Sequence, residues 1–173
     1  MFPYLRLGPF LLQMPLLALF IGFWIGNTFV EREAVRLGLN KEKINNLIGY
    51  GLFGGIFGAR LVYAAQYASV YLANPLGLFS LNTSTLSPIG GFLIGIAAAA
   101  AYGYRHKLPF RKTLDALTPG FAFFMIMIGV SHLLSGNAYG APTRVPWAVY
   151  LWSDYRQPTQ LYEIFFALMI FTI

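Results

Sequence analysis

The sequence predicts an all-α, polytopic membrane helix bundle: a single transmembrane domain over residues 1–173 with about five spans. Composition is the first indication, because 57% of the residues are hydrophobic and only 10% are charged, whereas soluble proteins carry about 25% charged residues. The second is a series of apolar runs, most of them near the roughly 20 residues that cross a bilayer as a helix. The third is that basic residues gather in alternate loops.

The first two runs have a short charged connection. Residues 9–30 form an apolar run in which Gln13 and Asn27 are the only strongly polar side chains. A cleavable signal peptide is not expected, because only Arg6 precedes this run and no small-residue cleavage site follows it. The charged loop 31–43 leads to a second span at 44–67, which contains Arg60.

Three more runs complete the predicted bundle. The loop 68–86 is polar without Lys or Arg, the loop 105–112 is basic, and 135–158 reads as an irregular loop. The runs themselves cover residues 87–104, 113–134 and 159–173. The last has about 15 residues, which rarely suffice to cross, so we expect the natural chain to continue.

The distribution of Lys and Arg predicts the orientation. Eight of the 12 lie in the loops after the first and third spans: Arg32, Arg36, Lys41, Lys43, Arg105, Lys107, Arg111 and Lys112. The positive-inside rule places these loops in the cytoplasm, with the amino terminus and the loop 135–158 on the outer face. Basic loops beside an anionic leaflet also account for the net charge of +6, so no nucleic-acid partner is expected.

Four ionisable side chains lie at or near membrane depth, where a charge costs roughly 2.5–3.5 kcal/mol. Arg60 and Glu163 either form an ion pair that locks two helices or line an outward-facing lipid site. His132 either makes a structural hydrogen bond or acts as a base, and Arg156 precedes the last run. We expect no metal, because His132 has no second histidine or carboxylate at i+3 or i+4. No cofactor is expected, and the absence of cysteine excludes disulfides and thiolate chemistry.

Small and aromatic residues leave two further alternatives open. Pairs of glycines four apart recur in the spans, as at Gly22 and Gly26 or Gly91 and Gly95. They indicate close helix packing or, alternatively, approach of a lipid to the backbone. Aromatic residues crowd the 136–158 segment, including Trp147 and Tyr150. They form either an interfacial belt or a cap over a headgroup site.

Six stretches, taken in order, resemble one family. They are residues 2–10, 33–39, 54–63, 90–91, 139–149 and 156–163, the last reading RQPTQLYE. Together they resemble prolipoprotein diacylglyceryl transferases, the bacterial inner-membrane enzymes of lipoprotein maturation. The resemblance implies up to seven spans and the transfer of a diacylglyceryl group from phosphatidylglycerol to a lipobox cysteine.

The resemblance also implies site residues. Arg60, Arg156 and Gly140 would contact the lipid phosphate, since a guanidinium binds phosphate in a bidentate way. The supporting residues would be Asn137, Gln160, Tyr162 and Glu163. His132 is the one candidate base.

The sequence departs from the family at its reactive positions. A family histidine falls at Ile89, an arginine at Gly129, an asparagine at His132, a glutamate at Asn137, a tyrosine near Pro15 and a second histidine at Gln157. The first hypothesis is therefore a catalytically degenerate relative, a lipid-binding or accessory subunit of a larger membrane protein complex, photosynthetic or respiratory. The alternative is an active transferase that uses Arg60, Arg156 and His132. A transporter is disfavoured, because no pair of broken spans repeats in the two halves.

Overall fold

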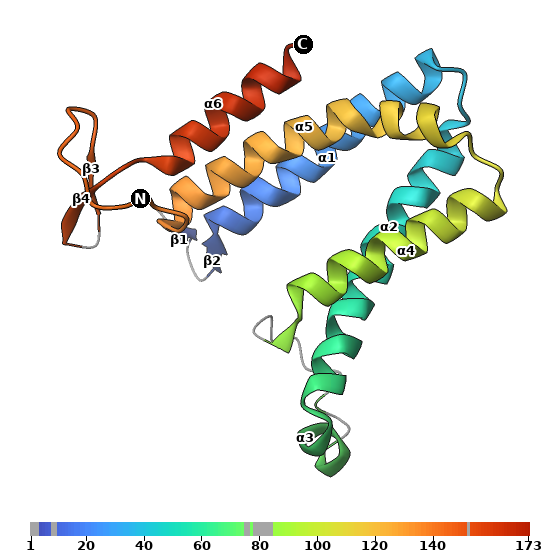
Figure 1. Cartoon of the computed structure of the whole chain (residues 1–173), viewed down its shortest axis with the longest axis horizontal. Coiled ribbons are helices and arrows are strands. Elements are labelled where there is room, and N and C mark those ends of the chain that lie inside the picture. Colours follow the sequence, from blue (N-terminus) through green and yellow to red (C-terminus); the bar gives the residue numbers. More distant parts are fainter. Residues whose placement is uncertain (1–3, 8–9, 75–76, 78–84, 152) are drawn as a thin grey trace. The chain divides into compact units, whose positions relative to one another are not determined.

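The computed structural model describes residues 4–7, 10–74, 77, 85–151 and 153–173 (Figure 1). Part of the first family-like stretch and about half of the loop 68–86 lie outside these residues. The chain divides into two compact units. The first contains Met1–Leu37 and Leu114–Ile173, and the second contains Gly38–Thr113.

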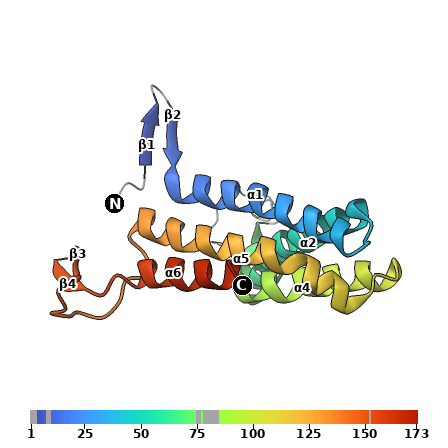
Figure 2. The same cartoon turned by 90° about the horizontal axis from the view of Figure 1, so that it is seen from above.

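The first unit is built on three helices: α1 (Met14–Arg36), α5 (Phe110–Ser135) and α6 (Thr159–Phe171). They lie side by side in both views (Figures 1 and 2). Glycines allow this: a Cβ on Gly26 of α1 would be 2.9 Å from the carbonyl oxygen of Gly120 in α5. Aromatic rings from all three helices also pack together, those of Phe29, Phe123 and Phe171.

Two predicted boundaries at the start of the chain are corrected. Residues 10–13, expected in the first span, form strand β2 (Phe10–Gln13), which pairs antiparallel with β1 (Tyr4–Leu7). The helix then runs past the predicted end to Arg36, so residues 31–36 are helical rather than loop. An ion pair between Glu33 and Arg36, one turn apart, supports this extension.

The second unit is a helical hairpin of α2 (Lys41–Gln66) and α4 (Pro88–Arg105), with the short α3 (Ala68–Ala73) after α2. The Asn40 and Ser87 side chains cap the first turns of α2 and α4. The two helices meet through glycines: a Cβ on Gly91 would lie 2.8 Å from the Gly55 carbonyl oxygen. This contact confirms the packing interpretation of the glycine pairs.

The expected membrane bundle is confirmed in its main features. Each of the five apolar runs contains a helix, and within the described residues α1, α2 and α5 are long and apolar enough to cross a membrane. Helix α4 has 18 residues, which is near the lower limit for a span. Helix α6 has 13 residues, which is fewer than a span needs.

The segment 135–158 is more regular than predicted. It contains a two-stranded antiparallel hairpin, β3 (Val149–Leu151) and β4 (Asp154–Arg156). The rings of Tyr150 and Tyr155 contact each other across the strands, with centroids 5.3 Å apart. Such cross-strand aromatic pairs stabilise short hairpins.

Candidate functional site

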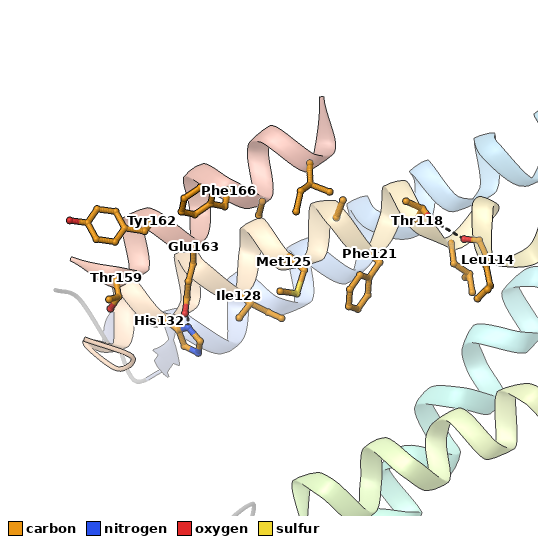
Figure 3. A pocket seen from close by; sticks show the side chains of 14 residues that line it. Leu114, Thr118, Phe121, Met125, Ile128, His132, Thr159, Tyr162, Glu163 and Phe166 are labelled. Atoms are coloured by element: carbon orange, nitrogen blue, oxygen red, sulfur yellow. Dashed lines mark hydrogen bonds and ion pairs between the residues drawn. The ribbon is translucent and has the colours of Figure 1, made fainter. Parts of the chain in front are cut away.

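Helices α5 and α6 line an open apolar groove with a volume of about 1140 Å³. All of its lining residues belong to the first unit. Figure 3 shows the side chains that line it. Those from α5 form one stripe at alternating spacings of four and three residues: Leu114, Thr118, Phe121, Met125, Ile128 and His132. From α6 come Tyr162, Glu163 and Phe166, among others. The groove is apolar along its length and carries ionisable groups at one end.

His132 and Glu163 form a hydrogen-bonded pair at that end. His132 Nδ1 lies 2.8 Å from Glu163 Oε2. An ionised carboxylate only accepts hydrogen bonds, so it selects the tautomer with the proton on Nδ1 and leaves Nε2 as the acceptor. The side chains are 34% and 43% exposed, and the ring of His132 extends beyond Glu163 in Figure 3. A neutral imidazole in this arrangement can take a proton at Nε2.

The segment between α5 and α6 is fixed to the start of α6 by side-chain hydrogen bonds. The buried Gln160, which is 2% exposed, donates from Nε2 to the Asn137 carbonyl oxygen at 2.7 Å. Thr159 donates its hydroxyl to the Ala138 carbonyl. Trp147 Nε1 donates to the Tyr162 hydroxyl at 2.7 Å. These bonds fix where α6 begins, and hence where Glu163 meets His132.

Gly140 also holds the segment between α5 and α6 against the residues just before α6. Its N–H donates to the Gln157 carbonyl at 3.0 Å, and a Cβ there would lie 2.8 Å from the Cβ of Gln157. The close backbone approach explains the glycine. Because the N–H already has a partner, it is not available to a lipid phosphate in this arrangement.

Arg156 lies at the end of β4, three residues before α6. Its guanidinium carbon is 4.8 Å from the centre of the Tyr139 ring, and its Nε donates to the Leu151 carbonyl. Stacking on an aromatic face holds a guanidinium flat while leaving donors at its edge. The side chain is therefore oriented in a way that suits phosphate binding.

Arg60 belongs to the second unit and is described there by itself. It donates to the carbonyl oxygen of Gly77 at 2.8 Å and to the carbonyl and hydroxyl of Thr85. It thus ties the end of α2 to the connection that leads to α4. Glu163 pairs with His132 in the first unit, and the ion pair with Arg60 stays a prediction.

The positions at which the family's reactive residues are replaced differ in the space around them. Ile89, near the start of α4, is 75% exposed. Gly129 faces α6, where a Cβ would lie 2.7 Å from Ile164 Cγ1 and 3.2 Å from its backbone nitrogen. An arginine at 129 would therefore displace α6 from α5. The glycine at position 129 therefore permits the close approach of α6 to α5 that places Glu163 beside His132.

Within the described ranges, no group of three or more histidine, cysteine, aspartate or glutamate side chains is placed to hold a metal ion. The groove itself was missed by reasoning from the sequence. The sequence pattern that predicts it is the heptad-like spacing of residues along 114–132, which puts the apolar stripe and His132 on one face of α5.

Comparison with known proteins gives consistent matches over nearly the whole chain. A family model described as prolipoprotein diacylglyceryl transferase matches residues 4–173. The phosphatidylglycerol–prolipoprotein diacylglyceryl transferases of Photobacterium profundum and Pseudoalteromonas translucida are each 30% identical over 96% of this chain. The protein of that name from Chromohalobacter salexigens is 33% identical over 92% of it. The chain spans 66%, 65% and 61% of the length of these relatives.

Proposed function

This chain belongs to the prolipoprotein diacylglyceryl transferase family, and we propose that it transfers the diacylglyceryl group of phosphatidylglycerol to a prolipoprotein cysteine. It is a multi-pass protein of the bacterial inner membrane. The relatives' names give the lipid donor and the protein acceptor. One observation carries the proposal: the His132–Glu163 pair, which supplies a base at the end of an apolar groove.

The reaction needs a thiolate, because the thiol itself is a poor nucleophile. His132 Nε2 takes the thiol proton, and Glu163 holds the ring and stabilises the imidazolium that forms. The sulfur then attacks the glycerol carbon that carries the phosphate ester. A C–S bond forms, the C–O bond to phosphate breaks, and glycerol phosphate leaves with its electron pair. The proton on His132 can pass to that leaving group.

Arg156 is the residue of the first unit best suited to the departing phosphate. Its guanidinium is positioned by the Tyr139 ring and by the Leu151 carbonyl. Charge-assisted hydrogen bonds to phosphate are roughly twice as strong as neutral ones. The predicted contact of Arg60 with a lipid phosphate stays a prediction.

The pairing of His132 with Glu163 changes the balance between the two hypotheses raised by the sequence. The replaced histidine and arginine positions, Ile89 and Gly129, favoured a degenerate accessory subunit. The main reason for that hypothesis was the absence of an obvious candidate base. The hydrogen-bonded His132 beside the groove is such a candidate. The accessory, lipid-binding subunit of a larger membrane complex is therefore the second candidate.

Complementation tests the proposal. The gene is expressed in a bacterium whose own diacylglyceryl transferase has been switched off, and lipidated prolipoprotein is measured by its shift on gels. We expect the wild-type chain to restore lipidation. His132→Ala should lower the rate about 10²- to 10⁴-fold, as loss of a general base does.

Two controls make the result specific. His132→Asn introduces the family's residue, which can hydrogen-bond to Glu163 but cannot take a proton, and it should be as inactive as His132→Ala. His106→Ala, at the chain's other histidine, should remain active. No lipidation by a wild-type chain that is present in the membrane would favour the accessory subunit. Full activity of His132→Asn would remove the base assignment.

A further inference from the structure

We propose that Tyr139 is a positioning residue: by holding the Arg156 guanidinium in one orientation, it sets the affinity of the chain for the phosphate of its lipid donor. The inference rests on the proposed function, in which Arg156 binds that phosphate, and adds a role for Tyr139. Its supports are the backbone pairing around Arg156, the stacking of the two side chains and the hydrogen-bond donors that the stacking leaves available.

The backbone of Arg156 is paired on both sides. Strand β3 pairs with β4 so that Val149 lies opposite Arg156, and Pro142 forms a bridge to Arg156 from the other side of β4. Backbone hydrogen bonds next to that bridge join residues 141–143 to residues 155–157. The Cα of Arg156 therefore has a fixed position, and only its long side chain remains to be oriented.

The ring of Tyr139 orients that side chain. The guanidinium carbon of Arg156 is 4.8 Å from the ring centre, within the distance at which an aromatic face attracts a cation. The Tyr139 ring is 45% exposed, so it is not a core residue of this region. A flexible arginine loses side-chain entropy when a ligand fixes it, and an orientation that is fixed beforehand lowers this cost of binding.

Stacking leaves donors of Arg156 available to an anion. The guanidinium N–H groups lie in its plane and point away from the ring face. Nε donates to the Leu151 carbonyl oxygen at 3.3 Å, and within the described part of the chain the two Nη atoms have no hydrogen-bond partner. The edge that carries both Nη atoms can bind two oxygens of one phosphate. Tyr139 and Leu151 thus determine where that edge points.

Lipid binding and lipidation, measured on the same preparations, test the inference. The purified chain in neutral detergent micelles is titrated with a fluorescent phosphatidylglycerol, and with a fluorescent diacylglycerol that has the same acyl chains but no phosphate. We expect Tyr139→Leu to weaken phosphatidylglycerol binding, and to raise the KM for this lipid, about fivefold, as loss of a cation–π contact does. Diacylglycerol binding should not change. Tyr139→Trp keeps an aromatic face and should stay within about twofold of the wild type.

Two further variants distinguish positioning from support of the fold. Tyr155→Leu is the matched control, because Tyr155 is 58% exposed and its ring contacts Tyr150 across the hairpin. It should bind phosphatidylglycerol like the wild type. Tyr139→Leu added to Arg156→Ala should cause no further loss of binding, because the ring acts only through the guanidinium. A further loss in that background, or an equal loss in Tyr155→Leu, would overturn the inference.

The two measurements also separate this inference from the proposed function. Weaker phosphatidylglycerol binding by Tyr139→Leu, in a chain that does not lipidate, would support positioning and count against transfer. Lipidation by the wild type, with unchanged binding and KM in Tyr139→Leu, would remove the role of Tyr139 alone. A wild-type chain that binds phosphatidylglycerol no better than diacylglycerol would also overturn the inference, because no phosphate would then be recognised.

Discussion

At the scale of single residues, Glu163 has two separable effects on His132. Its oxygen accepts the Nδ1 hydrogen bond at 2.8 Å, which fixes the tautomer and the ring orientation. Its negative charge stabilises the imidazolium once Nε2 has taken a proton. An amide can replace the first effect but not the second, so the two can be measured apart.

We expect Glu163→Gln to lower the lipidation rate about tenfold. The amide oxygen still accepts from Nδ1, but a hydrogen bond to a charged group is worth roughly 1–1.5 kcal/mol more than a neutral one. Glu163→Leu removes both effects and should approach the rate of His132→Ala. The measurement is single-turnover lipidation in membranes with matched protein levels. Equal rates for the glutamine and leucine variants would mean that Glu163 acts only through packing.

The sequence identified several of these residues but not how they pair. His132 stood out as an ionisable group at the end of an apolar run, and Glu163 stood out within the family-like stretch. They are 31 positions apart, and the sequence left open whether Glu163 forms an ion pair with Arg60 or lines a lipid site. The packing of Gly129 against Ile164 is one of the contacts that bring α6 close enough to α5 for Glu163 to reach His132. Such a contact depends on tertiary structure, which residue spacing alone does not specify.

At the scale of elements, the second unit depends on how closely α2 approaches α4. A Cβ on Gly95 would lie 2.9 Å from the Gly51 carbonyl oxygen and 3.2 Å from the Gly55 Cα. These neighbours are backbone atoms, which cannot rotate away. Lipid provides no hydrophobic drive between helices, so close packing carries most of the association.

We therefore expect Gly95→Ala to destabilise the helix pair by about 1–3 kcal/mol, the usual cost of overpacking a well-packed contact. Gly103→Ala in the same helix is the control, because its Cβ would meet only the tip of Leu47, at 3.4 Å. Unfolding in mixed micelles at increasing SDS concentrations measures both variants. Equal midpoints for the two variants would show that the approach of α2 to α4 does not limit stability.

The elements themselves were predictable to different degrees. Long apolar runs and capping residues such as Ser87 indicated the helices well. The strand Phe10–Gln13 was missed because a short apolar run reads equally as helix or strand when it lacks periodicity. The hairpin β3–β4 was missed because each strand has only three residues. Glycine spacing indicated close packing, but the same spacing fits any neighbouring helix.

At the scale of the whole molecule, the proposed chemistry requires His132 to face the outer side of the membrane, where the processing site of a signal peptide emerges. Eight of the 12 Lys and Arg residues in two loops predict this orientation. The short helix α6 then begins at the outer face, after the hairpin β3–β4. Orientation is thus a condition of the proposed function, and it can be measured without any assay of transfer.

The absence of cysteine makes the orientation directly measurable. Single cysteines replace Ser153, in the turn of the outer hairpin, or His106, after α4, and both positions are exposed. A membrane-impermeant maleimide applied to intact spheroplasts should label Ser153→Cys at once, and His106→Cys only after the membrane is permeabilised. The basic loop is held inside by the anionic leaflet, at about 1 kcal/mol per Lys or Arg. The reverse labelling pattern would place His132 near the cytoplasm, away from an emerging thiol, and would count against its assignment as the base.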